Sequence, residues 1–235
     1  MTLLRVIDLE TTGMEPPAEI IEFGSTDVEL GSNGVTISQP EAWLYRPTLA
    51  IPPETMAVHH IVDDDIPSDA PVCSADYLRA AVWRNPKPSV FVAHNCEFER
   101  KFINAEITGS APWICTYKAA LHIWPQAPKH SNQVLRYWRG LRLDPALAMP
   151  PHRAGPDAWV TAQLLSEMLQ LASIEQMTAW TAEPRPMPVI SFGKHRGLKW
   201  DEIPIDYLEW MTTQADMDAD VLFHANSELT RRRAR

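Results

Sequence analysis

The chain has 235 residues, of which 45% are hydrophobic and 22% charged, and its net charge is −9. This length suits one full domain with a small appendage, and no apolar run approaches the roughly 20 residues of a membrane span. Acidic residues near the start and three cysteines without metal-type spacing argue against a secretory signal and a disulfide framework, so a cytoplasmic location without membrane association is expected.

Basic residues are concentrated toward the end of the chain. Four of them and no acidic residue lie between Pro184 and Trp200, and the last five residues are RRRAR. An acidic body with local basic segments is consistent with a metal-dependent enzyme that contacts phosphate groups. A frayed, solvated tail is the alternative interpretation of residues 231–235.

Three extended segments open the chain, at residues 3–10, 19–30 and 35–47. Apolar patterning predicts strands, and the Gly-Ser-Asn-Gly sequence at residues 31–34 predicts a turn between the last two. Short connections between consecutive strands indicate an antiparallel meander. The proline- and acid-rich residues 51–66 predict a loop with short helical pieces, whose two adjacent histidines either face a substrate groove or are structural.

The remaining elements of the first 180 residues are one strand and several helices. A short apolar segment at residues 89–94 predicts a buried strand, and helix-forming composition begins at Cys96. Further helices are expected over residues 114–124 and 131–138. The clearest helix covers residues 156–172, where apolar residues recur at helical spacing and a proline suits the first turn.

A proline-rich segment divides the chain. Residues 181–188 contain three prolines and predict a linker. We therefore expect a main domain over residues 1–180 and a small C-terminal accessory module over residues 189–235, which ends in the Arg-rich tail.

Two carboxylates end the first predicted strand. Residues i and i+2 of a strand face the same side, so Asp8 and Glu10 project together. Neighbouring carboxylates stay ionised together only beside a cation or another positive partner. An exposed acidic strand end is the alternative, although Gly13 permits a sharp turn away from the sheet at this point.

Two further segments carry candidate functional groups. His94 and Asn95 end the later apolar strand, and Glu97 and Glu99 follow as either metal ligands or ordinary charges of a first helical turn. Asn95 itself is either a positioning residue or a turn residue. In the segment HRAGPDAW, the histidine lies on a loop and Asp157 lies in the first turn of a helix, where capping and the helix dipole also favour an acid.

These elements occur in one order: IDLETTG at residues 7–13, VAHNCEFE at 92–99 and HRAGPDA at 152–158. Together they resemble the three motifs of the DEDDh group of 3′→5′ exonucleases, which share the ribonuclease H-like fold. The resemblance covers residues 3–172. The tail SFGKHRGLKWDEIPIDYLEWM resembles the small C-terminal module of bacterial exodeoxyribonuclease X-type enzymes.

The resemblance implies a metal site. Four carboxylates would hold two divalent cations, Mg²⁺ or Mn²⁺: Asp8, Glu10, Glu99 and Asp157. Phosphodiester hydrolysis requires a neutralised phosphate, an activated water and a stabilised leaving alkoxide, which two cations about 3.5–4 Å apart supply. Oxygen ligands suit these hard ions. His152, on its loop, would be the general base for the attacking water.

Seven residues are candidates for substrate binding: Leu9, Thr11, Met14, His94, Asn95, Lys194 and Arg196. The resemblance implies that the backbone around Leu9 contacts the terminal 3′-hydroxyl and that Met14 lies against the terminal base pair. Lys194 and Arg196 would hold a phosphate backbone. Core packing is the alternative for Met14, and a solvated surface is the alternative for the two basic residues.

Position 99 departs from the pattern, because the second motif of the family normally ends in Asp. The extra methylene of Glu99 moves its carboxylate by roughly 1.5 Å, which can change a direct metal contact. Three interpretations stay open: Glu99 serves through another rotamer or a bridging water, Glu97 helps or replaces it, or the site is impaired.

The expected fold is α/β: a ribonuclease H-like mixed five-stranded sheet with an antiparallel opening meander, helices on both faces and the small C-terminal module. The expected function is metal-dependent 3′→5′ exonucleolysis of DNA, single-stranded and duplex, that releases nucleoside 5′-monophosphates. An RNA or short-oligonucleotide exonuclease, or a catalytically impaired end-binding or proofreading-type subunit, are the alternatives. The oligomeric state stays open, a homodimer included.

Overall fold

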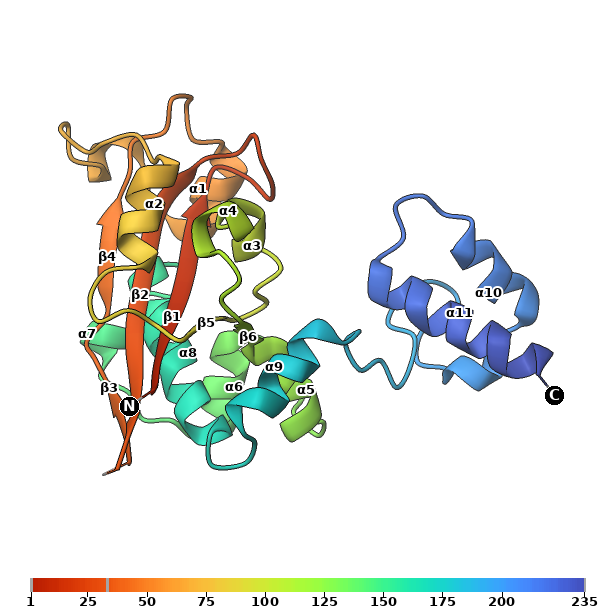
Figure 1. Cartoon of the computed structure of the whole chain (residues 1–235). Coiled ribbons are helices and arrows are strands. Elements are labelled where there is room, and N and C mark those ends of the chain that lie inside the picture. Colours follow the sequence, from red (N-terminus) through yellow and green to blue (C-terminus); the bar gives the residue numbers. More distant parts are fainter. Residues whose placement is uncertain (1, 33, 235) are drawn as a thin grey trace. The chain divides into compact units, whose positions relative to one another are not determined.

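The chain forms two compact units, which are described separately. The computed structural model describes residues 2–32 and 34–234; the first unit is Met1–Ala179 and the second is Trp180–Arg235 (Figure 1). Helix α9 (Ile174–Ala182) spans the boundary, and residues 183–188 form neither helix nor strand. Among the described helices, none combines the length and apolar character of a membrane span.

A mixed sheet of six strands forms the centre of the first unit. Its strands are β1 (Thr2–Thr11), β2 (Ile20–Gly31), β3 (Gly34–Ile37), β4 (Glu41–Leu44), β5 (Val90–Ala93) and β6 (Trp113–Cys115). Their order is β3-β2-β1-β5-β6, and β4 also pairs with β2. Strand β1 is antiparallel to β2 and parallel to β5, and β5 is parallel to β6. The expected α/β fold with its antiparallel opening is confirmed, with six strands instead of five.

The additional strand arises because the third predicted strand is divided in two. Strands β3 and β4 pair with different halves of β2; Ser38 still bonds to Asp27, and residues 39–40 pair with neither half. Pro40 has no N–H to donate, which explains the break in an otherwise strand-like sequence. The turn expected at residues 31–34 joins β2 to β3; its residue 33 lies outside the described residues.

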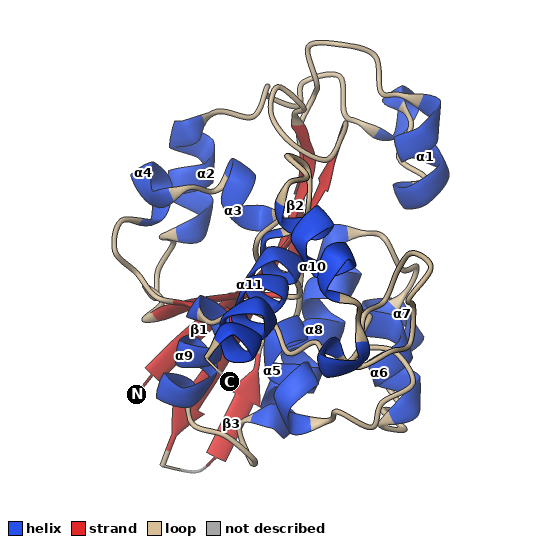
Figure 2. Ribbon diagram, turned by 90° about the vertical axis from the view of Figure 1, so that its right-hand side faces the viewer, coloured by secondary structure: helices blue, strands red, loops and turns tan. Residues whose placement is uncertain are grey.

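Helices lie on both faces of the sheet (Figure 2). One face carries α2 (Ala75–Val82), α3 (Glu99–Phe102) and α4 (Ala105–Thr108); the other carries α8 (Ala154–Met168), with α5 (Thr116–Ile123), α6 (Asn132–Trp138) and α7 (Pro145–Ala148) packed against it. The helix expected from residue 114 begins two residues later, because Ile114 and Cys115 pair with β5 as buried strand residues.

Alternation along β1 separates apolar from acidic residues. Ile7 and Leu9 are buried in the apolar cluster that contains α2 and α4 residues. Asp8 and Glu10 face the opposite side, toward α8. Strand β2 approaches α8 closely at Gly24, since a Cβ atom there would overlap the backbone of Ala154. This close approach brings the first turn of α8 beside the end of β1.

The second unit is a small helical module. A tight loop leads to the 3₁₀ turn η2 (Trp200–Glu202) and to helices α10 (Ile205–Thr212) and α11 (Ala219–Arg233). Its own apolar core includes Ile190, Ile203, Leu208, Met211 and Ala225, each at most 1% exposed. The second unit therefore has a core separate from that of the sheet domain.

Candidate active site

The carboxyl ends of two parallel strands meet at one edge of the sheet, and a cavity of about 420 Å³ lies there. Strand β1 ends with Asp8, Leu9, Glu10 and Thr11, and β5 leads directly into His94 and Asn95, all of which line the cavity. In parallel sheets, ligands characteristically bind beyond the carboxyl ends of the strands. The cavity also lies within the usual size range of small-ligand pockets.

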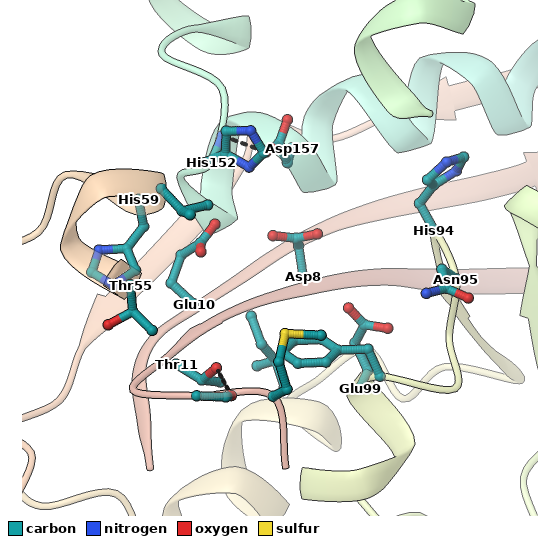
Figure 3. A pocket seen from close by; sticks show the side chains of 15 residues that line it. Asp8, Glu10, Thr11, Thr55, His59, His94, Asn95, Glu99, His152 and Asp157 are labelled. Carbon is teal, nitrogen blue, oxygen red and sulfur yellow. Dashed lines mark hydrogen bonds between the residues drawn. The ribbon is translucent and has the colours of Figure 1, made fainter. Parts of the chain in front are cut away.

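Three carboxylates converge in this cavity. Among residues 2–32 and 34–234, one group of possible metal ligands is found: Asp8, Glu10 and Asp157, whose ligand atoms lie within 4.8 Å of one another (Figure 3). Asp8 and Glu10 come from β1, and Asp157 comes from the first turn of α8. Strand alternation and the packing of α8 on β1 and β2 together produce this cluster.

Burial and mutual repulsion disfavour the simultaneous ionisation of the three carboxyl groups. Burial raises the pKa of Asp8 well above its ordinary value, and the negative charges of Asp157, Glu10 and Glu99 raise it further. Burial, with the charges of Asp157 and Glu22, also raises the pKa of Glu10 to about 8, and burial raises the pKa of Asp157. The carboxylates therefore require added positive charge to be ionised together at neutral pH.

Glu99 enters the same cavity from the other side of Asp8. In the view of Figure 3, its carboxylate and that of Glu10 lie on opposite sides of Asp8. Glu99 is only 2% exposed, its Oε2 atom is buried without a hydrogen-bond partner, and burial raises its pKa. It lies outside the 4.8 Å group formed by the three other acids. An unpartnered buried carboxylate oxygen is suited to a cation or an ordered water.

Glu97 does not line this cavity. Its carboxylate forms an ion pair with Lys118 at 3.0 Å, and its side chain is 59% exposed. The two-residue offset along the turn places Glu97 and Glu99 on different sides, so Glu97 is not in a position to replace Glu99 as a ligand in this conformation.

Two loop residues in the site have left-handed backbone conformations. Asn95 has φ 68° and His152 has φ 59°. Asparagine and histidine adopt this region more readily than most non-glycine residues, and residues in this conformation concentrate at functional sites. At Asn95 the conformation turns the chain from β5 toward α3 and presents Glu99 to the cavity.

His152 lies at the mouth of the cavity, next to Asp157. Its side chain is exposed, and its backbone N–H donates a hydrogen bond of 2.7 Å to Oδ2 of Asp157. The other carboxylate oxygen of Asp157 accepts a hydrogen bond from Gln133 at 3.0 Å. The loop position expected for His152 is thus observed, and Asp157 holds the backbone of that loop.

An ion pair between a buried carboxylate and a partly exposed arginine joins this loop to the sheet. Glu22 on β2 is 2% exposed and accepts two hydrogen bonds from Arg153, at 2.7 and 3.0 Å. It also accepts one from the backbone N–H of Ala154 at 2.8 Å. Because Arg153 directly follows His152, the pair positions the start of α8 and the histidine. Neither residue was assigned a role from the sequence, and the position of Glu22 opposite Glu10 depends on the register between β1 and β2.

Glu22→Gln is expected to lower the free energy of unfolding by about 2 kcal/mol, because the buried carboxylate accepts charge-assisted hydrogen bonds from Arg153 and Ala154 that a neutral amide cannot all replace. Glu167→Gln is the matched control: Glu167 pairs with Arg139 at 2.7 Å, but both side chains are about one-third exposed. The control should lose no more than about 1 kcal/mol. Urea denaturation measures both changes, and an equal loss in the two variants would contradict the proposed role of Glu22.

The predicted substrate-binding residues of β1 and the following turn all line the cavity. Leu9 and Thr11 are buried, and the hydroxyl of Thr11 donates to the carbonyl of Gly13 at 2.6 Å. Met14 is 73% exposed, and its carbonyl accepts a hydrogen bond from Lys101 at 3.3 Å. Met14 is therefore not a core residue, and an apolar side chain at this position is available to a ligand.

His94 also lines the cavity, but both of its ring nitrogens have partners within the protein. Nε2 lies 2.8 Å from the carbonyl oxygen of His130, and Nδ1 lies 3.0 Å from the hydroxyl of Thr116. Burial lowers the pKa of His94 to about 4, so the ring is neutral at neutral pH. Contact with a substrate would involve ring carbon atoms, since the nitrogens are occupied.

Helix α1 (Pro53–His59) supplies a wall of the cavity that the motif analysis did not assign. Thr55, Val58 and His59 line the cavity, whereas His60 is exposed and does not. His59 is 2% exposed; its Nδ1 accepts the backbone N–H of Ile61, and its Nε2 is buried without a partner. Phe98 is a further lining residue that the motifs did not identify. An apolar residue between two acids carries no distinctive sequence signal.

Lys194 and Arg196 belong to the second unit and do not line this cavity. The site residues of the first unit nevertheless form a set that suits divalent cations. Several carboxylates with raised pKa values surround one space, and one buried oxygen lacks a partner. Hard oxygen donors of this kind bind Mg²⁺, Mn²⁺ and Ca²⁺.

Comparisons with known proteins agree with this geometry. The fold matches solved DEDDh exonucleases, which are α/β proteins of the ribonuclease H-like type. A family model described as "Exonuclease" matches residues 6–165. The chain therefore belongs to the DEDDh family of 3′→5′ exonucleases, which use divalent metal ions.

Similar proteins include a bacterial exodeoxyribonuclease and a subunit of a bacterial DNA polymerase. Exodeoxyribonuclease 10 of Escherichia coli K12 is 32% identical over 219 residues, which are 91% of this chain and 92% of that protein. DNA polymerase III subunit epsilon of Treponema pallidum is 31% identical over 175 residues, 69% of this chain and 74% of that one. A solved structure of exonuclease X with 5′ overhanging duplex DNA has a TM-score of 0.63 and 31% identity, and covers 76% of this chain and 99% of that one.

Proposed function

We propose that the protein removes nucleotides from the 3′ end of DNA and releases nucleoside 5′-monophosphates. The observation that carries this proposal is the convergence of Asp8, Glu10 and Asp157 within 4.8 Å, with His152 beside them at the cavity mouth. Several carboxylates in one cavity can hold divalent cations, and such cations would neutralise the negative charge of a phosphodiester. The exposed histidine beside them can accept a proton from the attacking water.

Asp8, Glu10, Asp157 and Glu99 would hold two divalent cations, Mg²⁺ or Mn²⁺. The three carboxylates of the close group are direct ligand candidates, and the buried free oxygen of Glu99 offers a fourth, directly or through water. The chemistry that such ions supply is neutralisation of the phosphate and stabilisation of the attacking and leaving oxygens.

His152 would accept the proton of the attacking water at a ring nitrogen and act as general base. Its exposed ring lines the cavity, and its backbone is held by Asp157. The Glu22–Arg153 pair holds the next residue of the loop against the sheet. These contacts orient the histidine without using its ring, which stays available for proton transfer.

The DNA preference is supported by the relatives, since one is named an exodeoxyribonuclease and a solved relative is bound to duplex DNA. The residues Leu9, Thr11 and Asn95 would contact the terminal nucleotide in the cavity. Met14, with its exposed apolar side chain, would lie against the last base pair of a duplex. His59 would donate from Nε2 to a ligand atom, because its Nδ1 already accepts a hydrogen bond.

Digestion of matched 3′-labelled DNA and RNA oligonucleotides tests the proposal. With Mg²⁺ or Mn²⁺, the DNA strands should yield 5′-monophosphates faster than the RNA strands, and chelation of the metal should stop the reaction. Faster digestion of RNA would favour an RNA exonuclease on the same scaffold. Specific binding of 3′ ends without digestion under either metal would favour the impaired end-binding subunit.

Divalent metal is expected to raise thermal stability more at pH 8.5 than at pH 6. The folded metal-free protein binds protons tightly because burial raises the pKa of Asp8, Glu10 and Glu99. The contribution of these acids to stability is therefore fully present below their ordinary pKa values and is lost as the pH rises through the folded-state pKa, about 8 for Glu10. Metal binding reverses this loss, by about 2.7 kcal/mol at 100 times Kd.

Asp8→Asn is the control for this metal effect, because the variant keeps the shape of the side chain without its charge. In EDTA at pH 8.5 the variant should be more stable than wild type, and metal should stabilise it less. Melting temperatures at the two pH values, with and without Mn²⁺, give both comparisons. Equal stabilisation of wild type and Asp8→Asn by the metal would contradict the ligand assignment.

A further inference from the structure

Two aromatic side chains of α10 form a stacked pair in the second unit. Tyr207 and Trp210 are one helical turn apart, and their rings stack with centroids 5.1 Å apart and planes inclined by 27°. Trp210 is 45% exposed, whereas Tyr207 is partly buried. Tyr207 therefore covers one face of the indole ring of Trp210, and much of the rest of this ring is exposed to solvent. Exposing a large apolar ring to water is unfavourable and is typical of a binding surface.

The loop of residues 193–199, called the basic loop below, packs against Tyr207. The ring of His195 meets it edge-on at 4.6 Å, and Nζ of Lys194 lies 5.2 Å from its centroid as a cation–π contact. Gly193 has φ 64°, and a Cβ atom there would overlap the hydroxyl group of Tyr207. Only glycine allows this close approach without strain. The loop and α10 are thus closely fitted at the point where the exposed aromatic pair lies.

The lysine and arginine side chains of the basic loop differ from those elsewhere in the second unit in having no carboxylate partner in the part of the chain that the structure describes. Within the described part of this unit, Arg185 pairs with Asp218 and Asp220, Arg231 and Arg232 pair with Glu228, and Arg233 lies 3.7 Å from Glu209. No ion pair to a carboxylate is recorded among the described residues for Lys194, Arg196 or Lys199. Residues 184–200 contain no acid at all.

The Arg-rich terminus consequently has a structural role. Arg232 also donates hydrogen bonds of 2.9 to 3.1 Å to the carbonyls of Trp200, Asp201 and Ile203, which ties α11 to η2. Ion pairs and carbonyl contacts occupy Arg231 and Arg232. Within residues 180–234, the lysines and arginines without a carboxylate partner are therefore Lys194, Arg196 and Lys199.

We propose that Trp210, Tyr207, Lys194, Arg196 and Lys199 form a binding surface for single-stranded DNA on the second unit. A nucleobase would stack on the indole of Trp210, Lys194 over Tyr207 would contact an adjacent phosphate, and Arg196 and Lys199 of the same loop would contact phosphates further along the strand. Exposed aromatic rings beside unpaired cations are the recurring elements of single-strand binding. The inference rests on the proposed function for its ligand class, and it adds a second contact outside the catalytic cavity.

Nucleic acid fits this surface better than an acidic protein segment does. An acidic peptide would use the three cations but would leave the indole plane without a planar partner. A chain with net charge −9 is not generally attractive to polyanions, so a local acid-free basic segment beside a stacked aromatic pair is notable. A second contact on the same chain also raises the effective concentration of a long strand.

Fluorescence anisotropy of a labelled 30-nucleotide dT strand with the full chain in EDTA tests the proposal without requiring turnover. Trp210→Ala should weaken binding about tenfold, as expected for loss of one stacked base, and Trp210→Phe should restore most of it. Phe223→Ala is the matched control, since Phe223 is 49% exposed on α11 and packs edge-on against His224. Equal weakening by both alanine variants, or no weakening by Trp210→Ala, would overturn the proposal.

The triple variant Lys194→Ala, Arg196→Ala and Lys199→Ala tests the phosphate contacts. The slope of log K against log salt should become shallower by about 2, since single strands give roughly 0.7 per phosphate contact. Arg233→Ala, which removes a cation that is 70% exposed, should leave the slope unchanged. An unchanged slope in the triple variant would overturn the proposal that this surface binds nucleic acid. The same holds if polyglutamate displaces the labelled DNA as effectively as unlabelled dT does.

A short substrate separates this proposal from the catalytic one. A labelled dinucleotide has a single phosphodiester bond and requires only the catalytic cavity, so Trp210→Ala should digest it at the wild-type rate. The same variant should digest the 30-nucleotide strand more slowly at subsaturating concentration. If no substrate is digested by wild type, the catalytic proposal fails while the binding result still decides the role of Trp210.

Discussion

Replacing His152 with alanine is expected to slow 3′-end hydrolysis about 100- to 10,000-fold, the usual contribution of a general base. Substrate affinity and stabilisation by metal should change little, because the ring makes no contact that the carboxylate cluster needs. The bond from the backbone N–H of residue 152 to Asp157 is retained in the variant. Single-turnover digestion of a 3′-labelled DNA strand measures the rate.

His60→Ala is the matched control for this experiment. His60 is also an exposed histidine in the left-handed region, with φ 58° against 59° at His152, so both substitutions impose the same backbone strain. His60 does not line the cavity, and its variant should retain wild-type activity. Equal rates for His152→Ala and wild type would remove His152 from the mechanism, whatever the result for stability.

Glu99→Gln is expected to lower activity about 100-fold or more, because it replaces a buried carboxylate with a neutral amide of the same length. Glu99→Asp should retain activity within about tenfold, since the shorter acid is the residue that the family normally carries here. The reason lies in the position of Glu99, which is 2% exposed and has one oxygen without a partner. The same single-turnover assay measures both variants.

Glu97→Gln separates the three interpretations of this motif. Glu97 pairs with Lys118 and is 59% exposed, so its variant should keep full activity. Loss of activity in Glu97→Gln together with wild-type activity in Glu99→Gln would assign the fourth ligand to Glu97. Undetectable activity in wild type and recovery in Glu99→Asp would show that the native glutamate impairs the site.

Local sequence patterns were sufficient for much of the fold and for the orientation of several candidate site residues. Alternation along β1 places Asp8 and Glu10 on one face, and that face is observed. The helix-start position of Asp157 and the loop position of His152 also follow from nearby residues. These features depend on backbone periodicity and on glycine and proline, whose effects act over a few residues.

Contacts between distant segments could not be predicted in the same way. The Glu22–Arg153 pair joins residues 131 positions apart, and the wall formed by His59 depends on where α1 packs. The Arg-rich terminus suggested a solvated or DNA-binding tail, but Glu228 and the carbonyls of η2 bind two of its arginines. A charge pattern alone does not specify its partner.

The sequence by itself determined the carboxylates, the histidine and their order along the chain, because the strand and helix periods that orient them are local. Only the tertiary structure decided which acids share one cavity, since that depends on the parallel pairing of β1 with β5 and on the close approach of α8 at Gly24. It also distinguished Glu99, buried at the site, from Glu97, exposed beside Lys118. Burial and charge environment depend on all neighbouring elements together, and no single segment encodes them.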